Sequence, residues 1–160
     1  MVHPIKEDDL IKNILASAKT IAMVGVSSIK KEVSTNIKRR PSIIVMKYLQ
    51  EFGYRVIPVN PFSAGKKING EIVVEKLEDI TNPVDIVNVF RPSAEAPAIA
   101  KQAIKIGIKV FWLQYGIQNQ EAKQIVESKS ITYIANKCIK QEYQRLFLKI
   151  SPVFPALKAE

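Results

Sequence analysis

Two hydrophobic patterns alternate along this chain. Short, almost wholly apolar runs rich in Val and Ile are typical of strands buried on both faces of a sheet. Between them lie longer segments whose apolar residues recur at intervals of three and four, as they do on one face of a helix. The predicted strands are residues 20–26, 54–61, 84–90, 109–116 and 131–135, with a short extended piece at 71–74. The predicted helices are residues 7–18, 43–52, 76–80, 93–107, 119–129 and 140–150.

Residues at the ends of the predicted helices support these boundaries. Ser42 precedes a helix-period run and is a candidate N-cap, and Asn119 holds the same position before a later helix. Gly53 and Gly107 follow helical runs, where glycine adopts the left-handed C′ conformation at little cost. Gly65 and Gly70 mark turns between the second and third long strands.

Strands that alternate with helices imply right-handed βαβ units and a parallel sheet with helices on both faces. We therefore predict one α/β domain with a Rossmann-like, doubly wound parallel sheet in three layers, α/β/α. This domain takes in residues 1–160, with a core at about 10–148 and an extended tail at 151–160. In such a sheet a ligand binds beyond the carboxyl ends of the strands, where the strand order reverses.

Turn and polar residues follow the apolar runs, and those at the expected binding edge form a candidate site. They are Gly25, Val26, Ser27 and Ser28 after the first strand, Asn60 and Pro61 after the second, Phe90, Arg91 and Pro92 after the third, Gln114, Tyr115 and Gly116 after the fourth, and Asn136 and Cys138 after the last. Because the carboxyl ends of parallel strands share one edge of the sheet, these residues should lie along a common crevice.

The turn after the first strand departs from the dinucleotide fingerprint G-x-G-x-x-G. Ser27 and Lys30 stand where the second and third glycines belong. Asn60 replaces the Asp or Glu that would bind an adenosine ribose at the end of the second strand. Both differences argue against NAD, and the chain holds no G-x-x-x-x-G-K-[ST] string for a P-loop.

A different phosphate-bearing ligand fits these residues better. Ser27 and Ser28 offer hydroxyl groups, and the helix after Ser42 offers free N–H groups and the positive end of its dipole. Arg40 adds a cation close to the start of that helix. The alternatives are that Ser42 is a plain helix cap and that Arg40 is a solvated loop charge.

Charge and composition narrow the possible partners. The 160 residues carry a net charge of +9, with a basic cluster at Lys30, Lys31, Lys38, Arg39 and Arg40. This charge raises the possibility of nucleic acid, but no aromatic-interleaved face or recognition helix supports it. The single cysteine cannot form an intramolecular disulfide, and neither a leader nor a long apolar run is present. We therefore expect a cytoplasmic protein that does not associate with membranes.

Five stretches of the chain, in order, resemble the small stand-alone CoA-binding proteins. The fold of that family is similar to the N-terminal CoA-binding domain of the succinyl-CoA synthetase α subunit. The stretches are IAMVGVSS, RPS…YL…GYRVIPVNP, DIVNVFRP, FWLQYGI and NKCIKQEY, and the resemblance covers about residues 10–148. It implies that the ligand is coenzyme A (CoA) or an acyl-CoA, the thioester of CoA.

The resemblance also implies which part of CoA each part of the candidate site would meet. Residues 25–28, Arg40 and Ser42 would lie near the phosphates; Asn60, Pro61 and Lys66 would flank the adenosine and its 3′-phosphate; Phe90, Arg91 and Pro92 would meet the middle of the ligand; and Gln114, Tyr115 and Gly116 would line the pantetheine path. The loop between Ser28 and Arg40 is longer than is usual in these proteins, so Lys31, Lys38 and Arg39 are further candidates for phosphate contact.

The sequence points to binding rather than catalysis. The related synthetases work through a phosphohistidine in a second domain, whereas His3 here lies near the N-terminus, and no carboxylate pair or metal-ligand cluster follows the strands. Cys138 could exchange with a CoA disulfide or be a structural thiol. We therefore predict a non-catalytic carrier, sensor or accessory module for CoA or acyl-CoA. A redox sensor that binds NAD or another adenine nucleotide is the alternative, a nucleic-acid-binding protein comes third, and a protein partner or homo-oligomer stays open.

Overall fold

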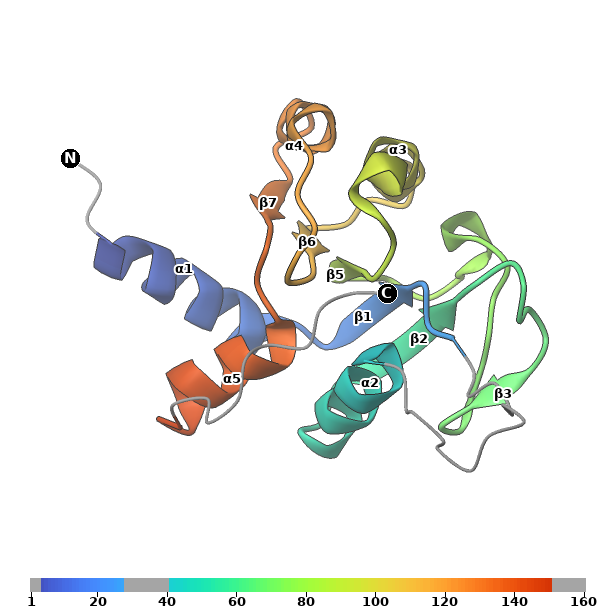
Figure 1. The fold of residues 1–160 in the computed structure, drawn as a ribbon, viewed down its shortest axis with the longest axis horizontal. Helices are drawn as coiled ribbons and strands as arrows, with labels where there is room; N and C mark the ends of the chain where they lie inside the picture. Colours follow the sequence, from blue (N-terminus) through green and yellow to red (C-terminus); the bar gives the residue numbers. More distant parts are fainter. Residues whose placement is uncertain (1–3, 28–40, 151–160) are drawn as a thin grey trace.

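A five-stranded sheet lies at the centre of the computed structural model, which describes residues 4–27 and 41–150 (Figure 1). Its strands are β1 (Thr20–Val24), β2 (Arg55–Val59), β5 (Ile86–Val89), β6 (Val110–Leu113) and β7 (Thr132–Ile134). They run parallel in the order β2-β1-β5-β6-β7, so the strand order reverses at β1. Val24 is in register with Val59 on one side and Val89 on the other, which brings the carboxyl ends of these strands together.

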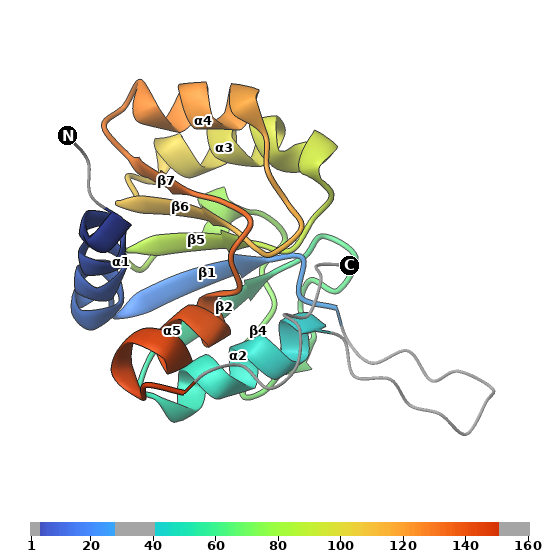
Figure 2. The ribbon, with the colours of Figure 1, turned by 60° about the vertical axis from the view of Figure 1, so that its left-hand side comes forward.

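Helices cover both faces of the sheet, as Figure 2 shows. Helices α1 (Pro4–Ser17), α2 (Pro41–Glu51) and α5 (Ile139–Phe147) pack on one face, and α3 (Ala96–Lys105) and α4 (Gln120–Glu127) on the other. Alternate residues of β1 enter the two cores, because successive side chains of a strand point to opposite faces. Ile21 and Met23 belong to the first core, whereas Ala22 and Val24 belong to the second. The predicted doubly wound α/β/α sheet is confirmed.

The connection between β2 and β5 folds back onto the edge of the sheet. It contains a hairpin of β3 (Lys67–Ile68) and β4 (Glu71–Ile72), followed by the 3-10 helix η1 (Leu77–Asp79). Asn69 and Gly70 both have positive φ, 47° and 83°, as a tight hairpin turn of type I′ requires. Val74 then bridges to Val59, and the Asn60 N–H donates to the Val74 carbonyl at 2.9 Å. This backbone pairing fixes residues 74–76 beside the end of β2.

The predicted helix ends are confirmed at Gly53, Asn119 and Gly107, which follows the C-cap of α3 with φ 73°, and wrong at Ser42. Gly53 has φ 96°; its N–H donates to the Gln50 carbonyl, and the Tyr54 N–H donates to the Leu49 carbonyl, the hydrogen bonds of a Schellman C-cap. Asn119 caps α4 by accepting a hydrogen bond from the Ala122 N–H at 2.9 Å. Ser42 is not an N-cap, because α2 begins one residue earlier, at Pro41. Proline fits the first helical position, where its missing N–H costs no hydrogen bond.

Smaller differences concern the length of the elements. The helix predicted at 93–107 begins with a turn of 3-10 helix, η2 (Ser93–Glu95), before α3. The closing helix α5 ends at Phe147, three residues before the predicted end. In the described ranges, none of the helices has the length and hydropathy that crossing a bilayer would require.

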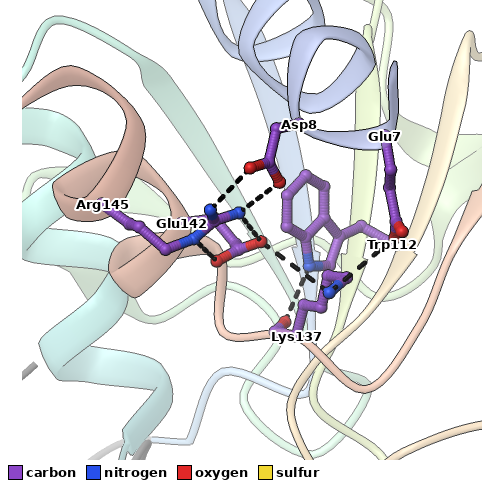
Figure 3. Close-up of polar contacts among 6 residues, drawn as sticks. All are labelled: Glu7, Asp8, Trp112, Lys137, Glu142 and Arg145. Carbon is purple, nitrogen blue, oxygen red and sulfur yellow. Dashed lines mark hydrogen bonds and ion pairs between the residues drawn. The ribbon is translucent and has the colours of Figure 1, made fainter. Parts of the chain in front are cut away.

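A network of ion pairs joins α1 to α5 (Figure 3). The Arg145 guanidinium donates to both carboxylate oxygens of Asp8, at 2.8 and 2.9 Å, and to both of Glu142, each at 3.1 Å. The Lys137 ammonium lies 3.8 Å from Glu7 and 4.0 Å from Glu142. Helix α1 is thereby attached to the helix that follows β7.

This network makes the stability of the fold dependent on pH. The Arg145 hydrogen bonds lower the pKa of the Asp8 carboxyl from its ordinary value of 3.8, so Asp8 stabilises the fold above that pH and loses the effect as the pH falls through its folded value. At pH 7, Asp8→Asn should reduce the free energy of unfolding by less than about 1 kcal/mol, because this side chain is 44% exposed.

Urea unfolding of the wild type and of Asp8→Asn at pH 7 and pH 3 measures this effect. We expect the difference between the two proteins to shrink at pH 3. Asp9→Asn is the matched control, since Asp9 takes part in none of the ion pairs found within the described residues. A difference that is the same at both pH values, or a control that behaves like Asp8→Asn, would contradict the prediction.

Candidate functional site

A pocket of about 500 Å³ lies beyond the carboxyl ends of β1, β2 and β5, on the face of the sheet that α3 covers. It therefore stands at the position where the strand order reverses, as the fold class predicts. Its apolar lining comes from Val24, Val59, Pro61, Phe62, Ala94, Ala98 and Ile99. Its polar lining comes from Asn60, Glu75, Lys76, Arg91, Glu95 and Gln102, with Gly25 completing the wall. We call this hollow the β2 pocket.

Gly25 brings the turn after β1 directly against the end of β5. Its N–H donates to the Val59 carbonyl at 2.9 Å, and its φ is 96°, a conformation that strains any residue with a Cβ. A Cβ at this position would lie 2.8 Å from the Phe90 carbonyl oxygen and 2.8 Å from Cδ of Arg91. Glycine is thus required here both for its φ and for its lack of a side chain.

Asn60 ties the turn after β1 to the turn after β2. Its side-chain Nδ2 donates to the Val26 carbonyl at 2.9 Å, and its Oδ1 accepts from the Phe62 N–H at 2.9 Å. The residue is only 9% exposed. Asn60 lines the β2 pocket, but both ends of its amide are engaged within the protein.

Asn60→Asp tests this bracing role. The carboxylate keeps the acceptor for Phe62 but replaces the donor with a negative oxygen facing the Val26 carbonyl. The free energy of unfolding should fall by about 1–3 kcal/mol, the cost of a buried polar group without its partner. Denaturant unfolding measures it, with Asn82→Asp as a control at an exposed loop position, where the same change should cost less than about 0.5 kcal/mol. Equal effects of the two substitutions would show that the Asn60 amide contributes little.

Arg91 extends across Gly25 and is held by a carboxylate on the next turn of the chain. Its Nε donates to Oε1 of Glu95 at 3.1 Å, and a terminal nitrogen donates to Oε2 at 2.7 Å. The two side chains are 37% and 46% exposed. Exposed ion pairs contribute at most about 1 kcal/mol, so a phosphate group entering the pocket can compete with Glu95 for the guanidinium.

A second group of predicted residues lies at the ends of β6 and β7. The Gly116 N–H donates to Oδ1 of Asn136 at 2.8 Å, and the Ile139 N–H at the start of α5 donates to Oε1 of Gln114 at 3.3 Å. Gln114 is fully buried, and Tyr115 packs against the core beneath α5. Cys138 is 5% exposed, so little of its thiol is accessible to a CoA disulfide, and its burial favours the structural role.

The other predicted residues are placed as follows. Val26 and Phe90 are fully buried, so their side chains belong to the core. Ser42 is also buried, and its hydroxyl accepts from the Ser27 N–H at 3.4 Å. Two exposed residues, Lys66 and Pro92, are not among those that line the β2 pocket. Ser28, Arg40 and the basic residues Lys31, Lys38 and Arg39 lie outside the described residues.

Sequence reasoning missed several residues of the β2 pocket, chiefly Phe62, Glu75, Lys76 and Gln102. Phe62 is 88% exposed, an unusual state for an aromatic side chain, and it directly follows the Asn-Pro turn. An aromatic residue directly after a strand-ending turn could have been predicted to line the site. Glu75 and Lys76 reach the pocket because residues 74–76 fold back beside β2. No hydrophobic periodicity in the sequence predicts that path.

Comparison with known proteins agrees with this fold. A family model described as CoA binding domain matches residues 19–144. The uncharacterized protein YneT of Bacillus subtilis (strain 168) is 39% identical over 140 residues, which is 88% of this chain and 95% of YneT. The solved structure of cell-free ID.343 from Thermus thermophilus is 36% identical, with a TM-score of 0.78, and the match covers 88% of this chain and 98% of that one. A hypothetical protein from Pyrococcus horikoshii OT3 is also 36% identical, with a TM-score of 0.77. This match covers 91% of this chain and 97% of that one.

This chain belongs to the CoA binding domain family, as the resemblance of its five stretches predicted. Membership supports a role in binding CoA. A more distant likeness is to the structure of RSP in complex with β-NADH, at 19% identity and a TM-score of 0.55, over 83% of this chain and 61% of that one. At that identity the likeness concerns the Rossmann-like fold alone.

Proposed function

We propose that this protein binds CoA or an acyl-CoA along the carboxyl edge of its parallel sheet, as a non-catalytic carrier, sensor or accessory module. The β2 pocket carries the proposal, because it lies at the reversal of strand order in a chain of the CoA binding domain family. A carrier or accessory role further requires a partner that supplies or takes the acyl group. We place the whole chain in one binding domain and, given its single cysteine, in the reducing cytoplasm.

The lining of the β2 pocket suits an adenine ring. Val24, Val59 and Ile99 offer apolar surface, and the exposed ring of Phe62 offers a face on which a base can stack. Arg91 lies against Gly25 in the wall of this pocket, close to where the diphosphate would follow the turn after β1. The pantetheine arm would then continue past the ends of β5 and β6 towards Gln114, Tyr115 and Gly116.

Calorimetric titration of the purified protein with CoA, acetyl-CoA, NAD and ADP tests the proposal. CoA and acetyl-CoA should bind at least about tenfold more tightly than NAD, a difference of about 1.4 kcal/mol. Tighter binding of NAD would favour the redox sensor, and equal or absent binding of all four would contradict both functions. Comparable affinities for CoA and acetyl-CoA would favour a sensor of the whole CoA pool over an acyl-group carrier.

A further inference from the structure

We propose that Lys76 reads the phosphate on the adenosine ribose of the ligand, so that the β2 pocket selects nucleotides with a phosphorylated ribose. This inference rests on the proposed function, which it deepens by naming the residue that sets the substrate class. The family resemblance implied Lys66 for the same phosphate, whereas Lys76 lines the β2 pocket and Lys66 does not.

The charges that line the β2 pocket support this assignment. There are four such side chains, Glu75, Lys76, Arg91 and Glu95. Arg91 is joined to Glu95 by two hydrogen bonds, whereas Lys76 takes part in none of the ion pairs within residues 4–27 and 41–150. Lys76 is therefore the lining cation whose charge no carboxylate of the described chain neutralises by direct pairing. Such a cation can bind a phosphate through a charge-assisted hydrogen bond.

The backbone holds Lys76 beside the end of β2. Two residues earlier, Val74 bridges to Val59, and the Val74 N–H donates to the Pro58 carbonyl at 3.0 Å. One residue later, Leu77 is fully buried in the core beneath α3 and begins η1. The Cα of Lys76 is thus fixed between two anchored residues, while its side chain remains exposed.

The end of β2 is where a sheet of this class holds the adenosine ribose. An acidic residue there reads a free ribose diol, and a cation nearby accommodates a ribose phosphate. Here Asn60 stands where that acidic residue would be, and its amide is hydrogen-bonded to the Val26 carbonyl and the Phe62 N–H. The group that discriminates at the ribose must therefore come from another segment, and among the described segments residues 74–76 lie alongside the end of β2.

The neighbouring lysines point elsewhere. Lys66 lies in the turn before β3 and does not line the β2 pocket. Lys67 lines a separate hollow, of about 310 Å³, together with Arg55, Glu71 and Asp79. Among the described lysines, Lys76 alone lines the β2 pocket.

The test compares Lys76→Met, which keeps most of the side-chain length without the charge, with Lys67→Met as a control, since Lys67 lines a separate hollow. Each protein and the wild type are titrated with CoA and with dephospho-CoA, which lacks the 3′-phosphate. Lys76→Met should weaken CoA binding about 5- to 50-fold, the range for a partly exposed charge-assisted hydrogen bond, and change dephospho-CoA binding less than about twofold. Lys67→Met should leave both affinities within about twofold, and Lys76→Arg should retain most of the preference for CoA.

The outcomes separate the inference from the function on which it rests. If the wild type binds CoA but Lys76→Met weakens CoA and dephospho-CoA equally, or weakens neither, the inference is overturned and the proposed function stands. If the wild type binds neither ligand, both fall. A parallel titration with NADP and NAD distinguishes the source of the phosphate: a preference for NADP that disappears in Lys76→Met shows that Lys76 reads any ribose phosphate, whereas an effect confined to CoA assigns it to the 3′-phosphate.

Discussion

Gly25→Ala should reduce the free energy of unfolding by about 2–5 kcal/mol. About 1–2 kcal/mol comes from placing a Cβ on a residue with φ 96°, and the rest from overpacking against the Phe90 carbonyl, which would lie 2.8 Å away. That oxygen belongs to the backbone at the end of β5, so it cannot move aside as a flexible side chain can. The turn after β1 would have to shift, and CoA binding should weaken with it.

Gly53→Ala separates the two causes. Gly53 has the same φ of 96°, but a Cβ there would meet nothing within 4 Å. It should therefore cost only the conformational part, about 1–2 kcal/mol, and leave CoA binding unchanged. Urea unfolding and CoA titration of both variants measure the effects. Equal destabilisation by the two substitutions would show that the close approach of the backbone at Gly25 and Phe90 does not add to the cost of a Cβ at position 25.

Trp112→Ala should reduce the free energy of unfolding by about 3–5 kcal/mol, about as much as Gly25→Ala. The Trp112 side chain is fully buried, and its indole N–H donates to the Lys137 carbonyl at 2.8 Å (Figure 3). Trp112→Phe keeps much of the apolar volume but leaves that carbonyl without its donor, for an expected loss of about 1–3 kcal/mol. Unfolding monitored by circular dichroism measures both.

The hydrogen bond from Trp112 also braces residues 136–138, where two of the candidate site residues lie. In Trp112→Phe the Gly116 N–H, which donates to Asn136, should exchange with solvent faster than in the wild type. Phe111→Leu is the control, since Phe111 is buried on the opposite face of the same strand. It should lower stability without changing exchange selectively at Gly116. Unchanged exchange in Trp112→Phe would mean that the loop is held by other contacts.

The sequence predicted the regular part of the fold because each element there repeats its signal. Every strand of the sheet is an apolar run, and every long helix shows the helical period, so position and type follow from burial. Ser42 illustrates the limit at a boundary. Its side chain is a good cap, but proline also fits the first helical position; α2 begins at Pro41, and Ser42 is buried inside the first turn.

The candidate site was predicted where it follows strands and missed where it does not. Gly25, Asn60, Pro61 and Arg91 line the β2 pocket because they end strands whose carboxyl edges must meet. Lys76 reaches the same pocket through a connection with strands of only two residues, whose path depends on contacts distant in sequence. Gln114 was expected along the pantetheine path; its side chain is fully buried, and its Oε1 accepts from the Ile139 N–H at the start of α5. No local pattern distinguishes a side chain that lines a crevice from one that supports it.

The pairing of residues 58–60 with Val74 also determines how copies of this protein could associate. β2 is an edge strand, and an unguarded edge offers its backbone to a strand from another molecule. On its outer side Pro58 has no N–H, the Pro58 carbonyl accepts from Val74, and the Asn60 N–H donates to Val74. An added strand could pair at most with Val56. A continuous sheet running through two copies is therefore blocked along β2, and β7 is the other edge of the described five-stranded sheet.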